Sequence, residues 1–170
     1  QLLYFTKNDT LSTDLFTQVN VYETLSAVIE TYEEMASQKE LQVTLKGSQN
    51  VEIFADQVSL IRIFSNVLSN AIKYNKKQGI IDIDITSDNQ YSYISFFDSG
   101  IGIKKEEISK IFNPFYRVDE ARTVDKLSLG IGLSMVERLI HQHQGHIKIE
   151  SEYGQYTKVT ITLPIKKNTL

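Results

Sequence analysis

The chain has 170 residues, 41% hydrophobic and 23% charged, which is enough for one folded domain around a single core. Its 18 Lys and Arg against 21 Asp and Glu give a net charge of -3, which argues against binding nucleic acid through bulk positive charge. The absence of cysteine excludes disulfides, cysteine-ligated zinc and thiol catalysis. No apolar run reaches the ~18 residues of a transmembrane helix. The initial Gln1 leads us to expect a fragment of a longer protein.

The first half of the chain shows the periodicity of two amphipathic helices. Apolar residues recur at helical spacing from Tyr22 to Gln38. A wider apolar stripe follows Asp56, which is placed to cap a long helix that ends near residues 75–77. Short strands are predicted at 19–21, 41–45 and 51–54.

The second half alternates strands with loops. Ile81, Ile83 and Ile85 alternate with polar residues, which indicates a half-buried strand, and a hairpin leads to a second strand over 91–97. A further helix is stopped by Gly145. Two closing strands are predicted at 146–150 and 156–163.

The segment from Asn113 to Leu129 is polar and irregular, and at ~17 residues it is longer than an ordinary connector in a compact domain. We therefore expect it to be a lid. The order of elements predicts an α+β fold, a two-layer α/β sandwich with mostly antiparallel strands and the helices on one face.

Two common nucleotide-binding motifs are absent. No two of the eight glycines are five residues apart, which excludes the P-loop. The third position of each glycine pair is occupied by Lys105 or Met135, so neither pair completes the GxGxxG fingerprint.

Two asparagines stand within the long helix, although asparagine is a poor helix former. Asn66 and Asn70 are four residues apart and share a face, with Lys73 beside them. They can be satisfied amides at the edge of the core. Alternatively, their carbonyl groups face a cleft, where one ligates a hard cation and Lys73 meets phosphate oxygens.

Three further segments carry candidate site residues. Asp98 follows an apolar strand and opens a glycine loop, where it either caps an Asx-turn or accepts a hydrogen bond from a ligand amine. The aromatic residues of 112–117 form either a hydrophobic cluster or part of a site. The glycine pair Gly130 and Gly132 opens a helix, whose N-terminus can attract phosphate, unless the glycines serve only close packing.

Three histidines near the end of the chain raise the question of a metal site. His141, His143 and His146 straddle Gly145, and no carboxylate is spaced with them as a ligand. This arrangement argues against metal binding.

Together and in this order, the segments resemble the catalytic and ATP-binding domain of bacterial sensor histidine kinases, in the superfamily shared with DNA gyrase, heat-shock chaperone and mismatch-repair ATPases. Residues 66–74 look like the N box, 98–102 the G1 box, 112–117 the F box and 130–133 the second glycine box. The resemblance covers the domain at residues 10–165. It identifies 1–9 with the tail of a preceding dimerisation helix and leaves 166–170 as a C-terminal tail. The family fold implies a mixed five-stranded sheet with an ATP lid.

The resemblance implies ATP and Mg²⁺ as cofactors. Asn70 matches the magnesium ligand, Asn66 matches an amide facing the phosphates, and Asp98 matches the carboxylate that takes the adenine amino group. The other matched residues contact phosphate or shape the pocket: Lys73, Tyr74, Gly100, Gly102, Arg117, Arg122, Gly130, Ile131, Gly132 and Leu133, with Lys126 a further lid candidate. No catalytic residue is assigned within the chain itself.

The implied function is transfer of the ATP γ-phosphoryl group to a histidine on an upstream domain, because this chain lacks the phosphoacceptor signature. The implied partners are the dimerisation and phosphoacceptor domain and a downstream response regulator, in a homodimeric parent that binds no nucleic acid. We expect a cytoplasmic domain of a protein anchored in the bacterial membrane.

Several alternatives stay open. Residues 127–129, Leu-Ser-Leu, depart from the glycine-rich pattern of the second box, which allows a degenerate nucleotide-sensing or docking module. A hydrolysing ATPase of the gyrase or chaperone type has a general-base Glu four residues before the magnesium Asn, where this chain has Asn66. A serine kinase of the same superfamily is also possible, but the segment before residue 10 favours the histidine class.

Overall fold

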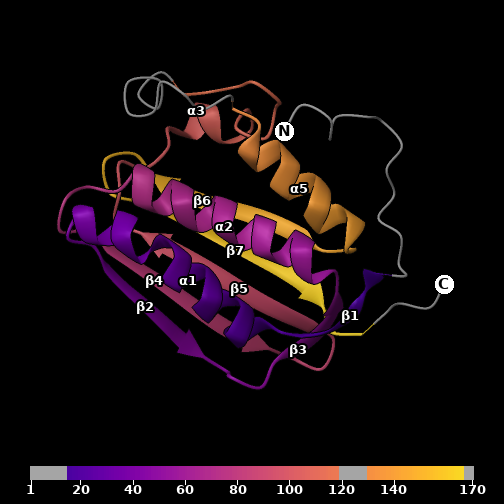
Figure 1. Ribbon diagram of the computed structural model, residues 1–170. Helices are drawn as coiled ribbons and strands as arrows, with labels where there is room; N and C mark the ends of the chain where they lie inside the picture. The colour runs from indigo at the N-terminus through magenta and orange to yellow at the C-terminus, as the bar shows by residue number, and fades with distance from the viewer. Residues whose placement is uncertain (1–14, 119–129, 167–170) are drawn as a thin grey trace.

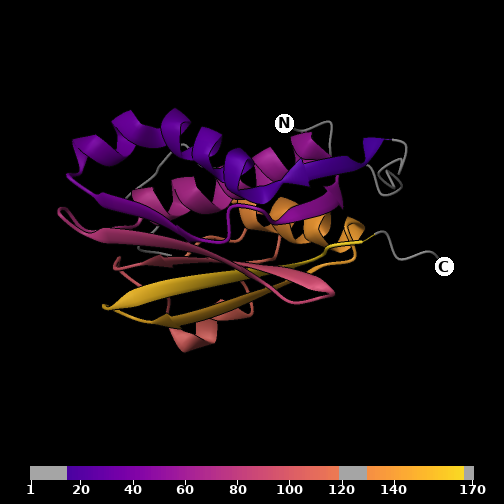
Figure 2. The same cartoon turned by 90° about the horizontal axis from the view of Figure 1, so that it is seen from below.

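The computed structural model describes residues 15–118 and 130–166 (Figure 1). In chain order the helices and strands are β1 (Thr17–Asn20), α1 (Val21–Gln38), β2 (Gln42–Gly47), β3 (Glu52–Ala55), α2 (Gln57–Lys73), β4 (Ile80–Ser87), β5 (Tyr91–Asp98), α3 (Lys105–Ile108), α5 (Gly132–Gln142), β6 (His146–Glu152) and β7 (Tyr156–Pro164). Figure 2 shows α1, α2 and α5 as one layer on a face of the sheet, and the short α3 beside β6. None of the helices described here has the length and apolar character that crossing a bilayer requires.

The main sheet has five strands in the order β2-β4-β5-β7-β6. β2 runs parallel to β4, and the other neighbouring strands are antiparallel. This arrangement confirms the predicted two-layer α+β fold with a mixed, mostly antiparallel sheet. The pairing of β1 with β3 in a separate two-stranded sheet was not predicted, because it joins segments on either side of α1 and β2.

The long helices begin where side chains can satisfy their first N–H groups. The side chain of Asn20 accepts a hydrogen bond from the Glu23 N–H at the start of α1. At α2 the predicted cap is confirmed, since Asp56 Oδ2 accepts from both the N–H and the hydroxyl of Ser59. Both caps fix where the helices start over the sheet.

The core lies between the helix layer and the main sheet, and at its centre α2 packs on the central strand β5. The rings of Phe64 on α2 and Phe96 on β5 are 6.2 Å apart, and both side chains are fully buried. Buried and partly exposed residues alternate along β5, with Ile94, Phe96 and Asp98 on the buried side. The strand period of two therefore puts the carboxyl group of Asp98 on the helix-covered face, at the end of the strand.

Of the three histidines near the end of the chain, His143 packs inside the protein. This residue is 4% exposed, and its Nε2 atom accepts a hydrogen bond from the Asp56 N–H while Nδ1 lies 2.7 Å from the Leu139 carbonyl oxygen. Its ring stacks on Phe16 at 4.6 Å. Both nitrogens are thus engaged within the protein, and residues 15–118 and 130–166 contain no group of three His, Cys, Asp or Glu side chains that could hold a metal ion.

One buried polar atom in β5 provides a test of the packing. The hydroxyl of Ser92 has no hydrogen-bond partner within the described residues, and the side chain is fully buried. Because an unpaired buried hydroxyl costs desolvation energy, we expect Ser92→Ala to leave the free energy of unfolding unchanged or to raise it by about 1 kcal/mol. Urea denaturation measures the difference.

Ser59→Ala is the matched control, because this serine is equally buried but its hydroxyl donates to the Asp56 carboxylate. We expect it to lower the free energy of unfolding by about 1–2 kcal/mol. Equal losses in both variants would contradict the assignment of Ser92 as unpaired.

Candidate functional site

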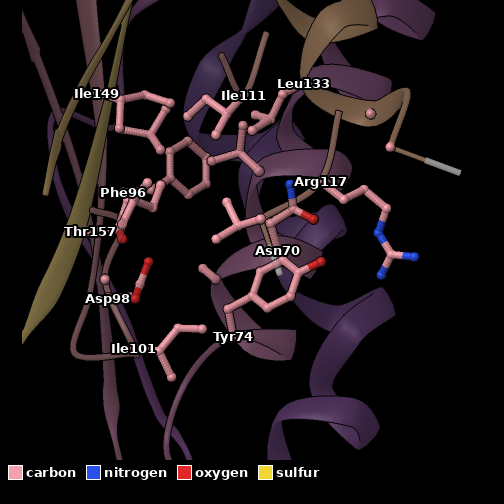
Figure 3. Close-up of a pocket in the computed structure, with 18 of the residues that line it drawn as sticks. Asn70, Tyr74, Phe96, Asp98, Ile101, Ile111, Arg117, Leu133, Ile149 and Thr157 are labelled. Atoms are coloured by element: carbon pink, nitrogen blue, oxygen red, sulfur yellow. The ribbon is translucent and has the colours of Figure 1, made fainter. Parts of the chain in front are cut away.

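A cavity of about 140 Å³ opens between α2, the end of β5, the start of α5 and the β6–β7 turn. Figure 3 shows polar groups at opposite sides of it: the Asp98 carboxylate on one, and the Asn70 amide, the Tyr74 hydroxyl and Arg117 on the other. The walls between them are largely apolar and include Phe96, Ile101, Ile111, Leu133 and Ile149. A pocket of this kind suits a flat apolar group with polar edges.

The glycine loop after β5 holds the Asp98 carboxylate in place. The Gly100 N–H donates to Asp98 Oδ1 at 2.9 Å, and the next N–H, of Ile101, donates to the Tyr74 carbonyl oxygen at 3.0 Å. A Cβ atom at Gly100 would lie 2.4 Å from that same Tyr74 oxygen, so no larger residue fits without moving the loop from the end of α2. The glycine is therefore required by a close backbone approach.

Asp98 is a buried acid with an incomplete set of partners. The residue is only 7% exposed, and within 15–118 and 130–166 the Gly100 N–H is the single protein group that hydrogen-bonds to its carboxylate. Burial raises the pKa of this carboxyl to about 6, against the opposing effect of the Gly100 hydrogen bond. A ligand N–H group in the cavity would supply the missing donor.

At the other side of the cavity, α2 and α5 meet through the two asparagines. Asn70 Nδ2 donates to Asn66 Oδ1 at 3.5 Å, and a Cβ atom at Gly132 would lie 2.5 Å from that Asn66 oxygen. Gly132 therefore lets the first turn of α5 approach Asn66 closely. With its Nδ2 atom directed at Asn66, Asn70 has its amide oxygen available to a ligand.

The N-cap residue of α5 offers no side-chain cap to the first turn. Ile131 occupies the N-cap position and makes no side-chain hydrogen bond, unlike Asn20 and Asp56 at the two longer helices. Orphan N–H groups at a helix start favour an anion. Just before this turn, Gly130 adopts a φ of +68° and its carbonyl oxygen accepts a hydrogen bond from the Phe115 N–H. This bond joins Phe115, in the predicted lid at 113–129, to the residue that follows the lid.

Most residues that the sequence predicts for the site line the cavity: Asn70, Tyr74, Asp98, Gly102, Arg117, Gly130, Gly132 and Leu133. Asn66 and Gly100 do not line the cavity themselves, but they contact the lining residues Gly132 and Asp98, respectively. Lys73 and Ile131 are not among the lining residues.

Several predictions fall outside the described residues. These are Arg122, Lys126, the departure at 127–129, most of the lid, and the dimerisation-helix tail at 1–9. The binding roles of all the site residues stay predictions.

Other lining residues escaped the sequence analysis. Thr157 on β7 pairs with Asp98 across the sheet, and Ile103 follows the glycine loop. Tyr153 lies at the β6–β7 turn, and the Lys104 Nζ atom is 5.0 Å from the centre of its ring. No motif marks these positions. Only the strand register of β5 and β7 could have identified Thr157.

Comparison with known proteins places these features in a family. The model of the histidine kinase-, DNA gyrase B- and HSP90-like ATPases matches residues 55–167. The chain is 32% identical over 151 residues to the sensor histidine kinase WalK of Bacillus subtilis, covering 88% of this chain and 25% of that protein. It is 34% identical over 154 residues to the sensor protein RprX of Bacteroides fragilis, covering 89% and 30%. The chain thus spans a quarter to a third of the length of these relatives.

Solved structures show the same fold. The catalytic domain of the histidine kinase ThkA superposes with a TM-score of 0.78 at 24% identity, covering 88% of this chain and 95% of that one. ThkA in complex with the response regulator protein TrrA gives a TM-score of 0.75 at 23% identity, covering 89% of this chain and 42% of that one.

The buried carboxyl group predicts a pH-dependent stability. The pKa of Asp98 in the folded chain, about 6, lies above its ordinary value of 3.8, so the folded state holds the proton more tightly than the unfolded state. Stability contributed by this group is therefore present below pH 3.8 and is lost as the pH rises toward 6. The loss amounts to roughly 3 kcal/mol at most, at ~1.4 kcal/mol per pKa unit.

Asp98→Asn removes this titration while keeping an oxygen that can accept from Gly100. We expect the free energy of unfolding of the variant, minus that of the wild type, to rise between pH 4 and pH 7, as measured by urea denaturation. A difference that stays constant over this range would contradict a raised pKa at Asp98.

Proposed function

Because the chain belongs to the family of histidine kinase-, DNA gyrase B- and HSP90-like ATPases, we propose that its cavity binds ATP with Mg²⁺ for phosphoryl transfer to a histidine on another domain. The observation that carries this proposal is the buried carboxylate of Asp98 at the edge of an apolar cavity, opposite an amide and an arginine. A purine triphosphate has the matching order of groups: an amine-bearing flat base, then a chain of anionic phosphates.

Adenine would lie between the apolar walls with its exocyclic amino group toward Asp98. An ionised carboxylate offers only acceptors, so it favours the amino group of adenine and repels the 6-oxo group of guanine. Because the carboxylate is buried with one protein donor among the described residues, the cost of leaving it unpaired favours ATP over nucleotides without that amine.

The triphosphate would extend toward α2 and the start of α5. The first turn of α5, whose N-cap residue Ile131 has no polar side chain, offers N–H groups, and Arg117 also lines the cavity. The donor chemistry also fits a magnesium ion, since Asn70 presents an amide oxygen there and Mg²⁺ takes few ligands from the protein when phosphates and water supply the others. Bound there, the ion would neutralise phosphate charge.

The chain would contribute to the reaction mainly by positioning and electrostatics. In the transfer, the bond between the γ-phosphorus and the bridging oxygen of ADP breaks, and a bond from phosphorus to an imidazole nitrogen forms. Asn66 offers an amide where a hydrolysing ATPase would need a proton acceptor, so this residue cannot activate water as a general base. This favours transfer over hydrolysis.

We also propose the setting of the domain. WalK is a sensor histidine kinase and RprX a sensor protein, which supports a homodimeric parent with a helical phosphoacceptor domain before residue 10, a response regulator as its partner and an anchor in the bacterial membrane. ThkA, a structural neighbour, has been solved in complex with the response regulator protein TrrA, which supports the same kind of partner here.

Asn70→Asp tests the proposal at the phosphate end. The added negative charge faces the polyphosphate, so we expect the Kd for a fluorescent ATP analogue in Mg²⁺ to rise about tenfold or more, equal to ~1.4 kcal/mol. The thermal unfolding midpoint should hardly change, because the side chain is half-buried at the cavity edge. In a longer chain that includes the acceptor histidine, phosphotransfer should also fall.

Asn89→Asp in the exposed β4–β5 hairpin makes the same change in charge away from the cavity and should leave binding intact. Loss of the thermal transition in Asn70→Asp would show a structural role instead. Absence of saturable, Mg²⁺-dependent binding by the wild type at millimolar ATP would favour the degenerate nucleotide module.

A further inference from the structure

We infer that Lys39, at the end of α1, is a positioning residue for the base-binding half of the cavity, an inference that rests on the proposed function. Lys39 is the C-cap residue of α1 and belongs to none of the motifs in the sequence. Its Nζ atom donates to three main-chain carbonyl oxygens at the end of α2: Ile72 at 3.0 Å, Lys73 at 2.5 Å and Asn75 at 3.2 Å.

An ammonium with three donors suits this place for two reasons. The last carbonyl groups of a helix have no partners within the helix, and the C-terminal end of the helix dipole favours a positive charge. Lys39 is partly buried, and its main-chain carbonyl oxygen also accepts a hydrogen bond from the Gln78 N–H. The residue therefore ties α1 to both sides of the turn that follows α2.

The same turn holds the loop of Asp98 on its other side. The carbonyl oxygen of Tyr74, between the carbonyl groups bound by Lys39, accepts the Ile101 N–H at 3.0 Å. Gly100 fits against this oxygen only because it lacks a Cβ atom. A shift of the turn by a few tenths of an ångström would therefore move the loop that fixes the Asp98 carboxylate.

A second connection runs through the side chain of Asn75, which is 6% exposed. Its Nδ2 atom donates to the Ile80 carbonyl oxygen, and its Oδ1 atom accepts from the Ser99 hydroxyl at 3.3 Å. Ser99 Oγ in turn accepts from the Ile80 N–H. Lys39 also binds the main-chain carbonyl group of Asn75. The position of the Asp98–Ser99–Gly100 segment therefore depends on Lys39 through both Tyr74 and Asn75.

The phosphate half of the cavity has different supports. Asn66 contacts both Asn70 and Gly132, between the middle of α2 and the start of α5. Loss of the Lys39 ammonium should therefore lower the affinity for the base without lowering the affinity for the phosphates. A general loss of stability would weaken both.

The test compares Lys39→Met with Lys77→Met in the full chain. Lys77 is an exposed neighbour that pairs with Glu40 at 2.7 Å, so its replacement removes the same charge without touching the end of α2. We expect Lys39→Met to raise the Kd for Mg²⁺–ATP about tenfold and to leave the Kd for inorganic tripolyphosphate unchanged. Lys77→Met should change neither, and Lys39→Arg should restore part of the ATP affinity.

Amide hydrogen exchange without nucleotide separates this inference from the proposed function. In Lys39→Met the Ile101 and Ser99 amides should exchange faster than in the wild type, while the amides at the centre of β5 should not. Unchanged exchange at Ile101, or equal losses of ATP and tripolyphosphate affinity, would overturn the positioning role. Failure of the wild type to bind ATP, with faster exchange in the variant, would instead reject the proposed function alone.

Discussion

The site depends on the carboxyl group of Asp98, which is buried but can still ionise. The pleat of β5 turns Asp98 toward the helix layer, where burial raises its pKa to about 6, and the adjacent Gly100 N–H limits the rise. A carboxyl group in this position destabilises the fold when it is charged. A ligand that supplies a hydrogen-bond donor to this carboxylate would offset the free-energy cost of burying it. The binding energy would then depend on that donor being present.

The rest of the site is arranged around the single helix α2. Its middle presents the asparagines, its last turn receives the glycine loop through the Tyr74 carbonyl, and its start is fixed by Asp56. The buried face of the same helix packs on β5, so one rigid helix would position both the base and the phosphates of a bound nucleotide. Such an arrangement supports positioning rather than chemistry by protein side chains.

Much of this could be predicted from the sequence, because the signals are local. The alternation around Ile83 and the cap at Asp56 mark their elements directly, and the glycines beside Asp98 indicate a backbone held close to something else. Thr157 and Lys39 could not be found in this way. Thr157 pairs with Asp98 and Lys39 binds the end of α2, which are contacts between segments far apart in the chain, and neither residue carries a motif.

The central claim is that the Asp98 carboxylate recognises an exocyclic amine. The most direct test is calorimetric titration of the wild type and Asp98→Asn with ATP and with inosine triphosphate, which has a 6-oxo group in place of the amine. We expect the wild type to prefer ATP by about a hundredfold or more, and we expect this preference to disappear in the variant, whose amide can donate to the oxo group. Equal affinities of the wild type for the two nucleotides would contradict this claim.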